Sequence, residues 1–376
     1  MGIAAVATGS NAGSKERQTN DGRRRKRRRR REAEEQKITR RRRIASNDDG
    51  PPSSHESPYV FGLYKHLTND LGFNVKVVLP SSQKSWIGKA FHIKEIVTGQ
   101  YYYPTEPYGY GETSEVSRPL KEGEVAEWIL LNGTPATCAN VGLYNLYRGE
   151  IDYVISGPNL GRNSSAAFAM SSGTIGAALS GALTGARALA LSYGTVVHPT
   201  PEEWLEPAHQ LAMRIIKELL DGWDTRLPNK ATHGNSLYNI NIPLISELLA
   251  GNGLPVYWTT LWRNSYSALF KAIPPPEPSA DTQPTARDVP AAGPDAPEAN
   301  PKGDAKGSVA PNASPLAFKW SPVMEGIVRP DLKTVPEGTD AWAIHKGYAS
   351  VTPLHAAFAE PVGNGGMALE DRKWKL

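Results

Sequence analysis

Three clusters of polar residues follow segments whose composition is typical of β-strands. The first cluster is Asn47-Asp48-Asp49-Gly50, the second runs from Ser81 to Gly88, and the third runs from Ser156 to Asn163. In an open parallel sheet, ligands bind at the edge formed by the carboxyl ends of the strands, where helix N-termini also converge. The sequence therefore predicts that the three clusters meet in one site.

The residue types in these clusters are those of a site for a hard divalent cation. The adjacent carboxylates of Asp48 and Asp49 repel each other unless a cation lies beside them. Carboxylate, hydroxyl and amide oxygens suit Mg²⁺, Mn²⁺ or Ca²⁺ better than Zn²⁺. Asp-Asp-Gly is also an ordinary turn signal, so this motif alone does not separate a metal site from a turn.

The glycine-rich third cluster matches no familiar phosphate loop. It lacks the Gly-Lys-Ser/Thr ending of a nucleotide-binding P-loop, and no Gly-X-Gly-X-X-Gly follows the first strand. Ser172-Gly173-Thr174 precedes an apolar run and has the form of a helix cap. The same three residues at a helix N-terminus can also hold a phosphate group.

The elements that would position these clusters alternate between short strands and amphipathic helices. This alternation predicts an α/β fold, a three-layer, Rossmann-like arrangement with a mostly parallel sheet between helices. Residues 81–125 are expected to make excursions from the sheet, 157–172 to form a loop, and 237–242 to close the sheet region. The predicted strands are 43–46, 74–79, 127–131, 151–156, 188–192 and 237–242, and the predicted helices are 59–71, 137–146, 174–183 and 201–220.

Composition divides the 376-residue chain into four parts. Residues 1–43 hold 16 Lys/Arg and almost no large apolar side chains, and residues 274–315 are rich in Pro and Ala without apolar periodicity. We expect the first to be a disordered basic tail and the second a disordered insertion. Residues 44–273 are the predicted core, and residues 316–376 are predicted to complete the same domain.

The charge of the core differs from that of the tail. The tail carries 16 Lys/Arg and 5 Asp/Glu, whereas the remaining chain carries 26 and 33 and is net negative. Nucleic acid is therefore expected to bind only through the tail, if at all. A single cysteine, Cys138, and the absence of a secretory signal predict a cytoplasmic protein with no membrane association, or a nuclear one if the tail is genuine.

The ordered series of motifs resembles the SurE family of survival-protein nucleotidases. The resemblance covers about residues 43–272 and 316–356. Besides the three clusters it rests on Gly133-Thr134-Pro135-Ala136-Thr137-Cys138, Ser172-Gly173-Thr174, Gly338-Thr339-Asp340 and the run from Gly347 to Leu354. After Asp-Asp-Gly the chain reads Pro51-Pro52-Ser53-Ser54-His55, closer to the fungal-type branch of the family than to its bacterial members.

The resemblance implies a divalent-metal-dependent phosphomonoester hydrolase, a 5′/3′-nucleotidase or an acid-phosphatase-like enzyme, with Mg²⁺ or Mn²⁺ as cofactor. The implied substrate is a nucleoside monophosphate or another small phosphomonoester. Asp48 and Asp49 would be catalytic, with Asp48 as general base or nucleophile. The implied metal ligands are Asp48, Asp49, Ser85 and Asn159, and the implied substrate-binding residues are Asn47, Gly157, Asn163, Ser172, Gly173 and Thr174.

The resemblance also implies a homodimer or tetramer, with the C-terminal segment reaching a neighbouring subunit. Trp86 stands where the family commonly has glycine after the metal-binding serine, so its ring would narrow the pocket or stack on a base. The alternative reading is a noncatalytic nucleotide- or RNA-binding module whose basic tail contacts phosphates. Such a module has no need of all four implied metal ligands, so their joint presence favours the hydrolase.

Overall fold

The computed structural model describes residues 42–358 except for positions 55, 195–196, 198, 224–235, 252 and 274–315. Most of the predicted basic tail, the predicted insertion and residues 359–376 therefore lie outside the described residues. Arg42 and Arg43, the last two residues of the predicted tail, already belong to the first strand, β1 (Arg42–Ser46).

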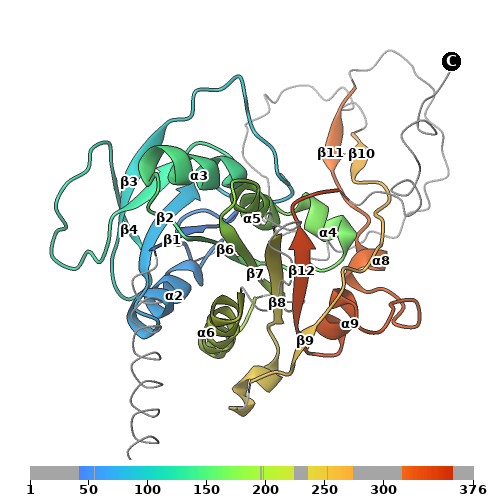
Figure 1. Cartoon of the computed structure of the whole chain (residues 1–376). Coiled ribbons are helices and arrows are strands. Elements are labelled where there is room, and N and C mark those ends of the chain that lie inside the picture. Colours follow the sequence, from blue (N-terminus) through green and yellow to red (C-terminus); the bar gives the residue numbers. More distant parts are fainter. Residues whose placement is uncertain are drawn as a thin grey trace, which may run out of the picture.

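The sheet at the centre of the fold has ten strands in the order β4-β3-β5-β2-β1-β6-β7-β8-β12-β9 (Figure 1). The six strands from β5 to β8 in this order are parallel. Their bounds are β1 as above, β2 (Asn74–Pro80), β5 (Trp128–Leu131), β6 (Tyr153–Leu160), β7 (Arg187–Gly194) and β8 (Ser236–Pro243). The predicted α/β class with a mostly parallel sheet is confirmed.

Strand β1 marks the point at which the order of the sheet reverses. β2 and β5 lie on one side of it, whereas β6, β7 and β8 follow on the other. In open α/β sheets the crevice outside the strand ends at this switch point is where ligands bind. The Asn47–Gly50 turn leaves β1 at this crevice, and Asn159 lies near the end of β6 beside it.

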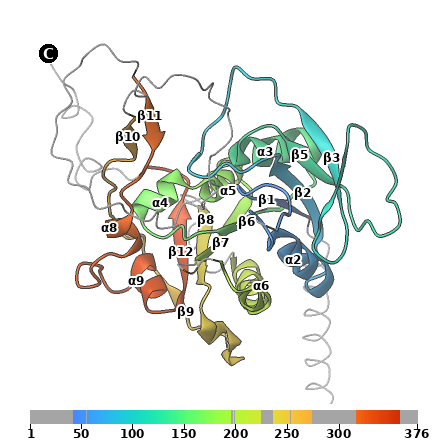
Figure 2. The same cartoon turned by 180° about the vertical axis from the view of Figure 1, so that it is seen from behind.

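Helices cover both faces of the sheet and make it the middle of three layers (Figures 1 and 2). One face carries α2 (Val60–Lys65), continued by a wider π-type turn (His66–Asp70), and α6 (Leu205–Asp221), preceded by a short 3₁₀ turn (Glu202–Trp204). The other carries α3 (Pro135–Val141), likewise continued by a π-type turn (Gly142–Leu146), and α5 (Gly173–Leu183).

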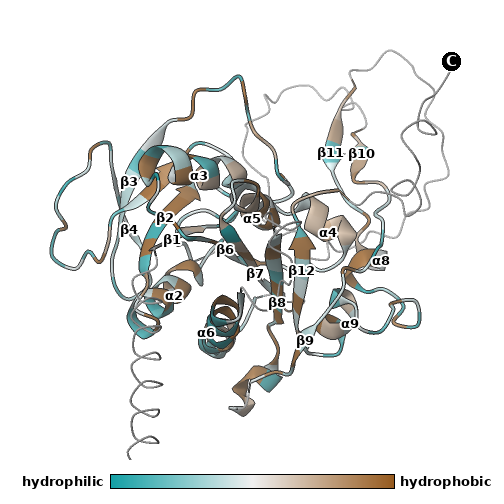
Figure 3. Cartoon of the chain, in the orientation of Figure 1, coloured by the Kyte–Doolittle hydropathy of each residue, from teal (hydrophilic) through white to brown (hydrophobic). Residues whose placement is uncertain are grey.

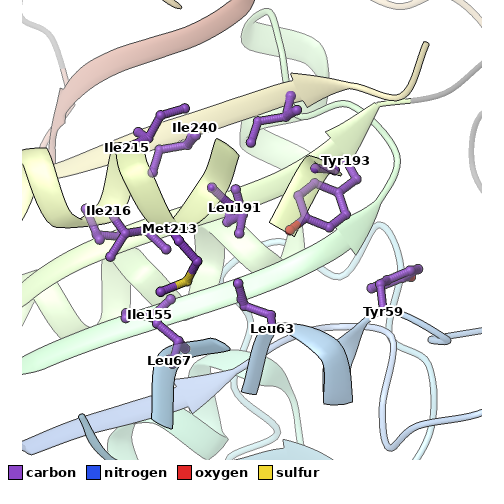
Figure 4. Close-up of a cluster of buried hydrophobic side chains, with 14 of the residues drawn as sticks. Tyr59, Leu63, Leu67, Ile155, Leu191, Tyr193, Met213, Ile215, Ile216 and Ile240 are labelled. Carbon is purple, nitrogen blue, oxygen red and sulfur yellow. The ribbon is translucent and has the colours of Figure 1, made fainter. Parts of the chain in front are cut away.

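Helix α6 shows why these segments are helical and how they pack. Its apolar residues recur at helical spacing, so one side is hydrophobic and faces the sheet while the other is polar (Figure 3). Ile215, Ile216 and Met213 on this side pack with Leu191 and Ile240 from the sheet (Figure 4). Fully burying a side chain of this size stabilises the fold by about 1.5–3 kcal/mol.

The opposite core is built from smaller side chains. Ala178 and Ala182 of α5 pack on Ala188 and Ala190 of β7, and all four are fully buried. Gly181 lies so close to the sheet that a Cβ there would be 2.7 Å from Cγ2 of Val154. The small residues of the 166–192 region thus let α5 approach the strands closely and bring its N-terminus to the strand ends.

Several boundaries differ from those predicted. Helix α3 begins two residues earlier than expected, because Thr134 caps it through Thr137 N–H at 3.1 Å and Pro135 suits the first turn. The predicted 157–172 loop instead contains the end of β6 and a short helix, α4 (Ala166–Ser171). Strand β6 continues through a register shift between Ser156 and Asn159, which Gly157 permits with φ +118°.

The sheet also extends further at both edges than the sequence indicated. Within the predicted excursion 81–125, β3 (Gly99–Pro104) and β4 (Gly111–Ser114) add antiparallel strands beyond β5. Strand β8 does not close the sheet, because β12 (Ala349–His355) pairs antiparallel with it and β9 (Val256–Trp258) pairs with β12.

The remaining C-terminal elements lie around this second edge (Figures 1 and 2). They are a 3₁₀ turn (Ser246–Ala250), α8 (Glu325–Val328), α9 (Asp340–His345) and a two-stranded ribbon of β10 (Phe270–Ala272) and β11 (Phe318–Trp320). Among the described residues, every helix is too short or too polar to span a membrane.

Candidate active site

The turn after β1 is closed by Asn47. Its Oδ1 accepts a hydrogen bond from Gly50 N–H at 3.0 Å, and its Nδ2 donates to Gly50 O at 3.1 Å. Gly50 has φ +85°, a conformation that glycine adopts without strain. The carbonyl oxygen of Asp48 accepts from Lys84 N–H at 2.7 Å, which ties the loop after β2 to this turn.

The carboxylate of Asp48 contacts the N-terminus of α5. Thr174 Oγ1 donates to its Oδ1 at 2.5 Å, and a Cβ added to Gly173 would be 2.8 Å from the Asp48 Cβ. Burial raises the pKa of Asp48, and this rise is partly offset by the Thr174 hydroxyl and by the backbone N–H groups of Thr174 and Gly173. The helix N-terminus therefore supports the negative charge of Asp48.

Asp49 is held by different groups from those that hold Asp48. Its Oδ2 accepts from the Tyr59 hydroxyl at 2.6 Å and from Leu160 N–H at 3.0 Å. Burial, followed by the charge of Asp48, raises the pKa of Asp49 well above its usual range. Tyr59 itself belongs to the large hydrophobic core (Figure 4), so its hydroxyl holds Asp49 from a rigid position.

Half of the ten predicted site residues line a single pocket at the strand ends. The predicted residues Asp48, Ser85, Asn159, Asn163 and Ser172 are among those that line it. Five others complete the lining. Trp86, Gly161 and Arg162 lie within the predicted polar clusters, whereas Phe168 and Ser171 had not been assigned to the site from the sequence. The structure thus brings together residues from the turn after β1, the loop after β2, the end of β6 with the segment that follows it, α4 and the N-cap of α5.

The donor set of this pocket fits a hard divalent cation. The Ser85 hydroxyl oxygen is buried and has no hydrogen-bond partner among the described residues. Asn159 Nδ2 donates to Gly161 O at 3.0 Å, so its Oδ1 is the amide atom that could coordinate a cation. Two buried neighbouring carboxylates with raised pKa values gain most from a cation, because it offsets their desolvation and mutual repulsion.

Asp48 is the only carboxylate among the residues that line the pocket, and the neighbouring carboxylate of Asp49 is not one of them. Among the described residues there is no cluster of three or more His, Cys, Asp or Glu side chains suited to a metal ion. A cation here would therefore depend on hydroxyl and amide oxygens as well, which is usual for Mg²⁺ but not for Zn²⁺.

Asn163 is fixed by polar side chains inside the sheet. Its backbone N–H donates to Asn241 Oδ1 at 2.7 Å, its carbonyl accepts from Asn239 Nδ2 at 2.8 Å, and its Nδ2 donates to Ser192 Oγ at 2.7 Å. An amide NH₂ group has two N–H bonds, so one remains for a ligand. Sequence reasoning missed Asn239 and Asn241, although their alternation with Ile240 marks polar residues on one face of a buried strand.

Two residues expected to bind substrate have structural tasks instead. Both amide atoms of Asn47 are engaged by Gly50, and a Cβ on Gly157 would be only 2.1 Å from Leu191 O. Neither residue is among those that line the pocket. Gly173 and Thr174, also expected to bind phosphate, contact Asp48.

The C-terminal segment supports the loop that leads out of β6. Asp340 is fully buried at the start of α9 and accepts from Ser165 N–H at 2.8 Å and Trp262 N–H at 2.9 Å. Burial raises the pKa of Asp340 to about 6. Arg162, a buried cation in the pocket wall, donates to Val328 O at 2.8 Å in α8.

Comparison with known families agrees with this architecture. The model of the family described as "Survival protein SurE" matches residues 44–268, more than half of the chain and the part that contains all the pocket residues. The chain belongs to the SurE family.

Relatives of this SurE chain include proteins of different lengths. A Saccharomyces cerevisiae protein named "Probable tubulin--tyrosine ligase PBY1" is 30% identical over 81% of this chain, and the chain spans only 40% of that protein. Proteins named "5′-nucleotidase SurE" from Pelotomaculum thermopropionicum and Synechococcus sp. are each 28% identical, over 65% and 75% of this chain and 73% and 80% of their own lengths.

A solved structure shows that the fold is shared. The crystal structure of the SurE protein from Aquifex aeolicus superposes with a TM-score of 0.51 and 21% identity, covering 85% of this chain and 94% of that one.

Proposed function

We propose that this SurE-family chain is a divalent-metal-dependent phosphomonoester hydrolase, most simply a 5′/3′-nucleotidase that cleaves a nucleoside monophosphate to nucleoside and phosphate. The observation that carries the proposal is the single pocket lined by Asp48, Ser85 and Asn159 together with the Ser172 end of α5. The names of the bacterial relatives support the same reaction class. A broader acid-phosphatase-like specificity uses the same chemistry.

Asp48, Asp49, Ser85 and Asn159 would hold Mg²⁺ or Mn²⁺. When bound, such an ion neutralises phosphoryl oxygens and lowers the pKa of a coordinated water. Tyr59 and Leu160 N–H fix Asp49, and Thr174 fixes Asp48, so the two carboxylates are oriented before any ligand arrives. Such preorganisation is a main source of electrostatic catalysis.

The remaining groups of the pocket bind and surround the phosphoryl group. Asn163 presents an amide N–H, and Ser172 lies at the positive end of the α5 dipole. Asp48 is the carboxylate beside these donors, and we assign it the role of general base or nucleophile. Arg162 adds a positive charge to the same wall, which favours a dianionic ligand.

Phosphate release from a panel of substrates tests the proposal. The panel contains nucleoside 5′- and 3′-monophosphates and 4-nitrophenyl phosphate, first with EDTA and then with excess Mg²⁺ or Mn²⁺. We expect no release with EDTA and restored release with metal. Failure to release phosphate from every substrate under every metal would overturn the hydrolase and favour a noncatalytic nucleotide-binding role.

We also infer that the chain forms a homodimer or tetramer. The β10–β11 ribbon exposes Phe270, Phe318 and Trp320, each more than 40% accessible, and the edge strand β9 exposes Trp258. Sedimentation velocity at micromolar concentration is expected to show a species at least twice the mass of the 40.8 kDa chain. A monomer at concentrations well above those of the assay would contradict this inference.

A further inference from the structure

The lining of the pocket contains both polar and aromatic side chains. Asp48, Asn159 and Ser172 supply polar atoms, and Trp86 and Phe168 supply aromatic rings. Trp86 directly follows Ser85, so the indole is attached to the same short loop as the unpartnered hydroxyl. A ligand whose phosphoryl group contacts the polar residues therefore meets aromatic rings in the wall of the same pocket.

The backbone of Trp86 is strained. Its φ is +62°, and Trp86 and Ser165 are the two non-glycine residues with positive φ in the described part of the chain. This conformation costs a bulky L-residue roughly 1–2 kcal/mol, and glycine adopts it without that cost. Strain of this kind is retained where the surrounding structure fixes it and is common at ligand sites.

Aromatic residues from separate segments hold the Trp86 ring in place. Phe168 of α4, Tyr266 and Trp320 of β11 have ring centroids 5.9, 6.1 and 5.1 Å from it, with interplanar angles of 68°, 67° and 63°. Met324 packs in the same cluster. None of the three rings lies parallel to Trp86, so no stacked partner among them occupies the position that a flat ligand ring would take.

We propose that Trp86, positioned by Phe168 and Trp320, recognises a flat aromatic ring on the leaving group of the substrate. The proposal rests on the proposed phosphohydrolase function and narrows its substrate class. It favours nucleoside monophosphates and aryl phosphates over aliphatic phosphomonoesters. A stacked ring gains free energy from apolar burial and π contact regardless of which base is present, so discrimination among bases is expected to be small.

The test compares 5′-AMP with ribose 5-phosphate, which has the same phosphate and sugar but no base. In Trp86→Gly, the ratio of kcat/KM for 5′-AMP to that for ribose 5-phosphate should fall roughly tenfold, the loss typical of one base–aromatic stack. Glycine relieves the strain at φ +62°, so this variant removes the ring without forcing the loop to move. Trp86→Leu is the second variant, because it keeps apolar volume and removes only the aromatic ring.

Tyr110→Ala is the matched control. It removes an exposed aromatic ring that stacks on Tyr108 with centroids 5.7 Å apart and does not line the pocket. We expect its ratio of kcat/KM for 5′-AMP to that for ribose 5-phosphate to equal the ratio of the wild type. Thermal unfolding identifies any variant that is not folded.

Calorimetric titration of the wild type and the variants with both ligands in EDTA separates recognition from turnover. If the wild type binds 5′-AMP more tightly than ribose 5-phosphate and a Trp86 variant loses this difference, the proposed aromatic site is supported. This holds even if no substrate is hydrolysed. The absence of hydrolysis would overturn only the proposed function. Equal binding of the two ligands by the wild type overturns the aromatic site. The aromatic site is also overturned if the kcat/KM ratio of 5′-AMP to ribose 5-phosphate is unchanged in either folded Trp86 variant. The same holds if that ratio falls equally in Tyr110→Ala.

Discussion

Ser85 has a buried polar atom whose missing partner a ligand could supply. Its hydroxyl is buried without a hydrogen-bond partner among the described residues, and an unpaired buried hydroxyl costs about 1–3 kcal/mol. Asp48, Asn159 and the rest of the pocket lining surround it. A cation that accepts this oxygen as a ligand would recover the cost.

Ser85→Ala therefore separates metal binding from stability. In EDTA the variant should be as stable as the wild type or slightly more stable, because no hydrogen bond is lost. Its Mn²⁺ affinity should fall about tenfold or more, as is typical when a metal site loses part of its ligand shell. Isothermal titration with Mn²⁺ and thermal unfolding in EDTA measure the two effects.

Ser82→Ala is the control for this substitution, because it removes an exposed hydroxyl from the same loop. It should leave both quantities unchanged. If Ser85→Ala bound Mn²⁺ as tightly as the wild type, Ser85 would not be a ligand.

The types and order of the residues in the sequence predicted much of the pocket lining. Asp48, Ser85, Asn159, Asn163 and Ser172, chosen from their places after strands and from the family motifs, do line one pocket. Tyr59 could not be found in this way, because its hydroxyl reaches Asp49 only through the packing of α2 on the sheet. Asp340 was quoted in a motif, but its hydrogen bonds join segments far apart in the sequence.

Helix α5 is the element on which the carboxylate of Asp48 depends. Its N-terminus presents the N–H groups of Gly173 and Thr174 to this carboxylate, while Ser172 caps it through Ile175 N–H at 3.1 Å. The close approach is possible because Gly173 has no side chain. A Cβ there would be 2.8 Å from Asp48 Cβ and 3.0 Å from Ile87 Cγ2.

Gly173→Ala should therefore damage activity although alanine is the better helix former. The added methyl group must push Asp48 or the helix aside, and we expect a fall in kcat/KM of at least tenfold, since small displacements of reacting groups are costly. Overpacking should also lower the free energy of unfolding by roughly 1–3 kcal/mol. Steady-state kinetics and urea unfolding check the two effects.

Gly326→Ala in α8 is the matched control, because a Cβ there meets nothing within 4 Å. It should change neither quantity. Equal kinetics for Gly173→Ala and the wild type would mean that the α5 N-terminus does not position Asp48.

Among the helices and strands, long elements with clear apolar periodicity were predictable from the sequence, whereas irregular elements were not. The predicted helix 201–220 matches α6 closely because one of its sides is apolar throughout. The end of β6 was not predicted, because Ser-Gly-Pro-Asn reads as a loop in isolation. Its pairing with β7 through a shifted register supplies the hydrogen bonds that the local sequence does not reveal.

Over the whole molecule, the reacting groups lie between two unlike cores. The core on the α2 and α6 side is built from large side chains and contains a buried titratable group, His209, which is 3% exposed. Its Nδ1 lies 2.8 Å from the Tyr193 hydroxyl. Burial, with a smaller effect of nearby His66, lowers the pKa of His209 to about 3.

This pKa makes the fold sensitive to mild acid. The unfolded chain takes up the His209 proton near pH 6.5, whereas the folded chain does so only near pH 3, so stability falls as pH decreases between these values. The loss from this group is about 2 kcal/mol at pH 5. His209→Gln can accept the Tyr193 hydrogen bond but does not titrate.

Urea unfolding at pH 7 and pH 5 measures this effect. The decrease in unfolding free energy between the two pH values should be smaller in His209→Gln than in the wild type by about that amount. Identical decreases would show that His209 is not buried in its neutral form.

The fold class of the whole molecule followed from the alternation of strand-like and helix-like segments. The extent of the sheet did not follow in this way, because β12 enters it from beyond residues 274–315, the predicted insertion. Long-range pairing of this kind, here between Val351 and Ile240, leaves no local signal in the sequence.

The most direct test of the account is metal-restored phosphate release from 5′-AMP by the wild type and by Asp48→Asn, side by side. Asparagine matches the shape of Asp48 and can still accept the Thr174 hydrogen bond, so the variant should fold with an unchanged melting temperature. We predict that the wild type releases phosphate when Mg²⁺ or Mn²⁺ replaces EDTA and that the folded variant is at least ~10³-fold slower, as expected when a general base or nucleophile is removed. A folded Asp48→Asn protein with wild-type turnover would contradict the account.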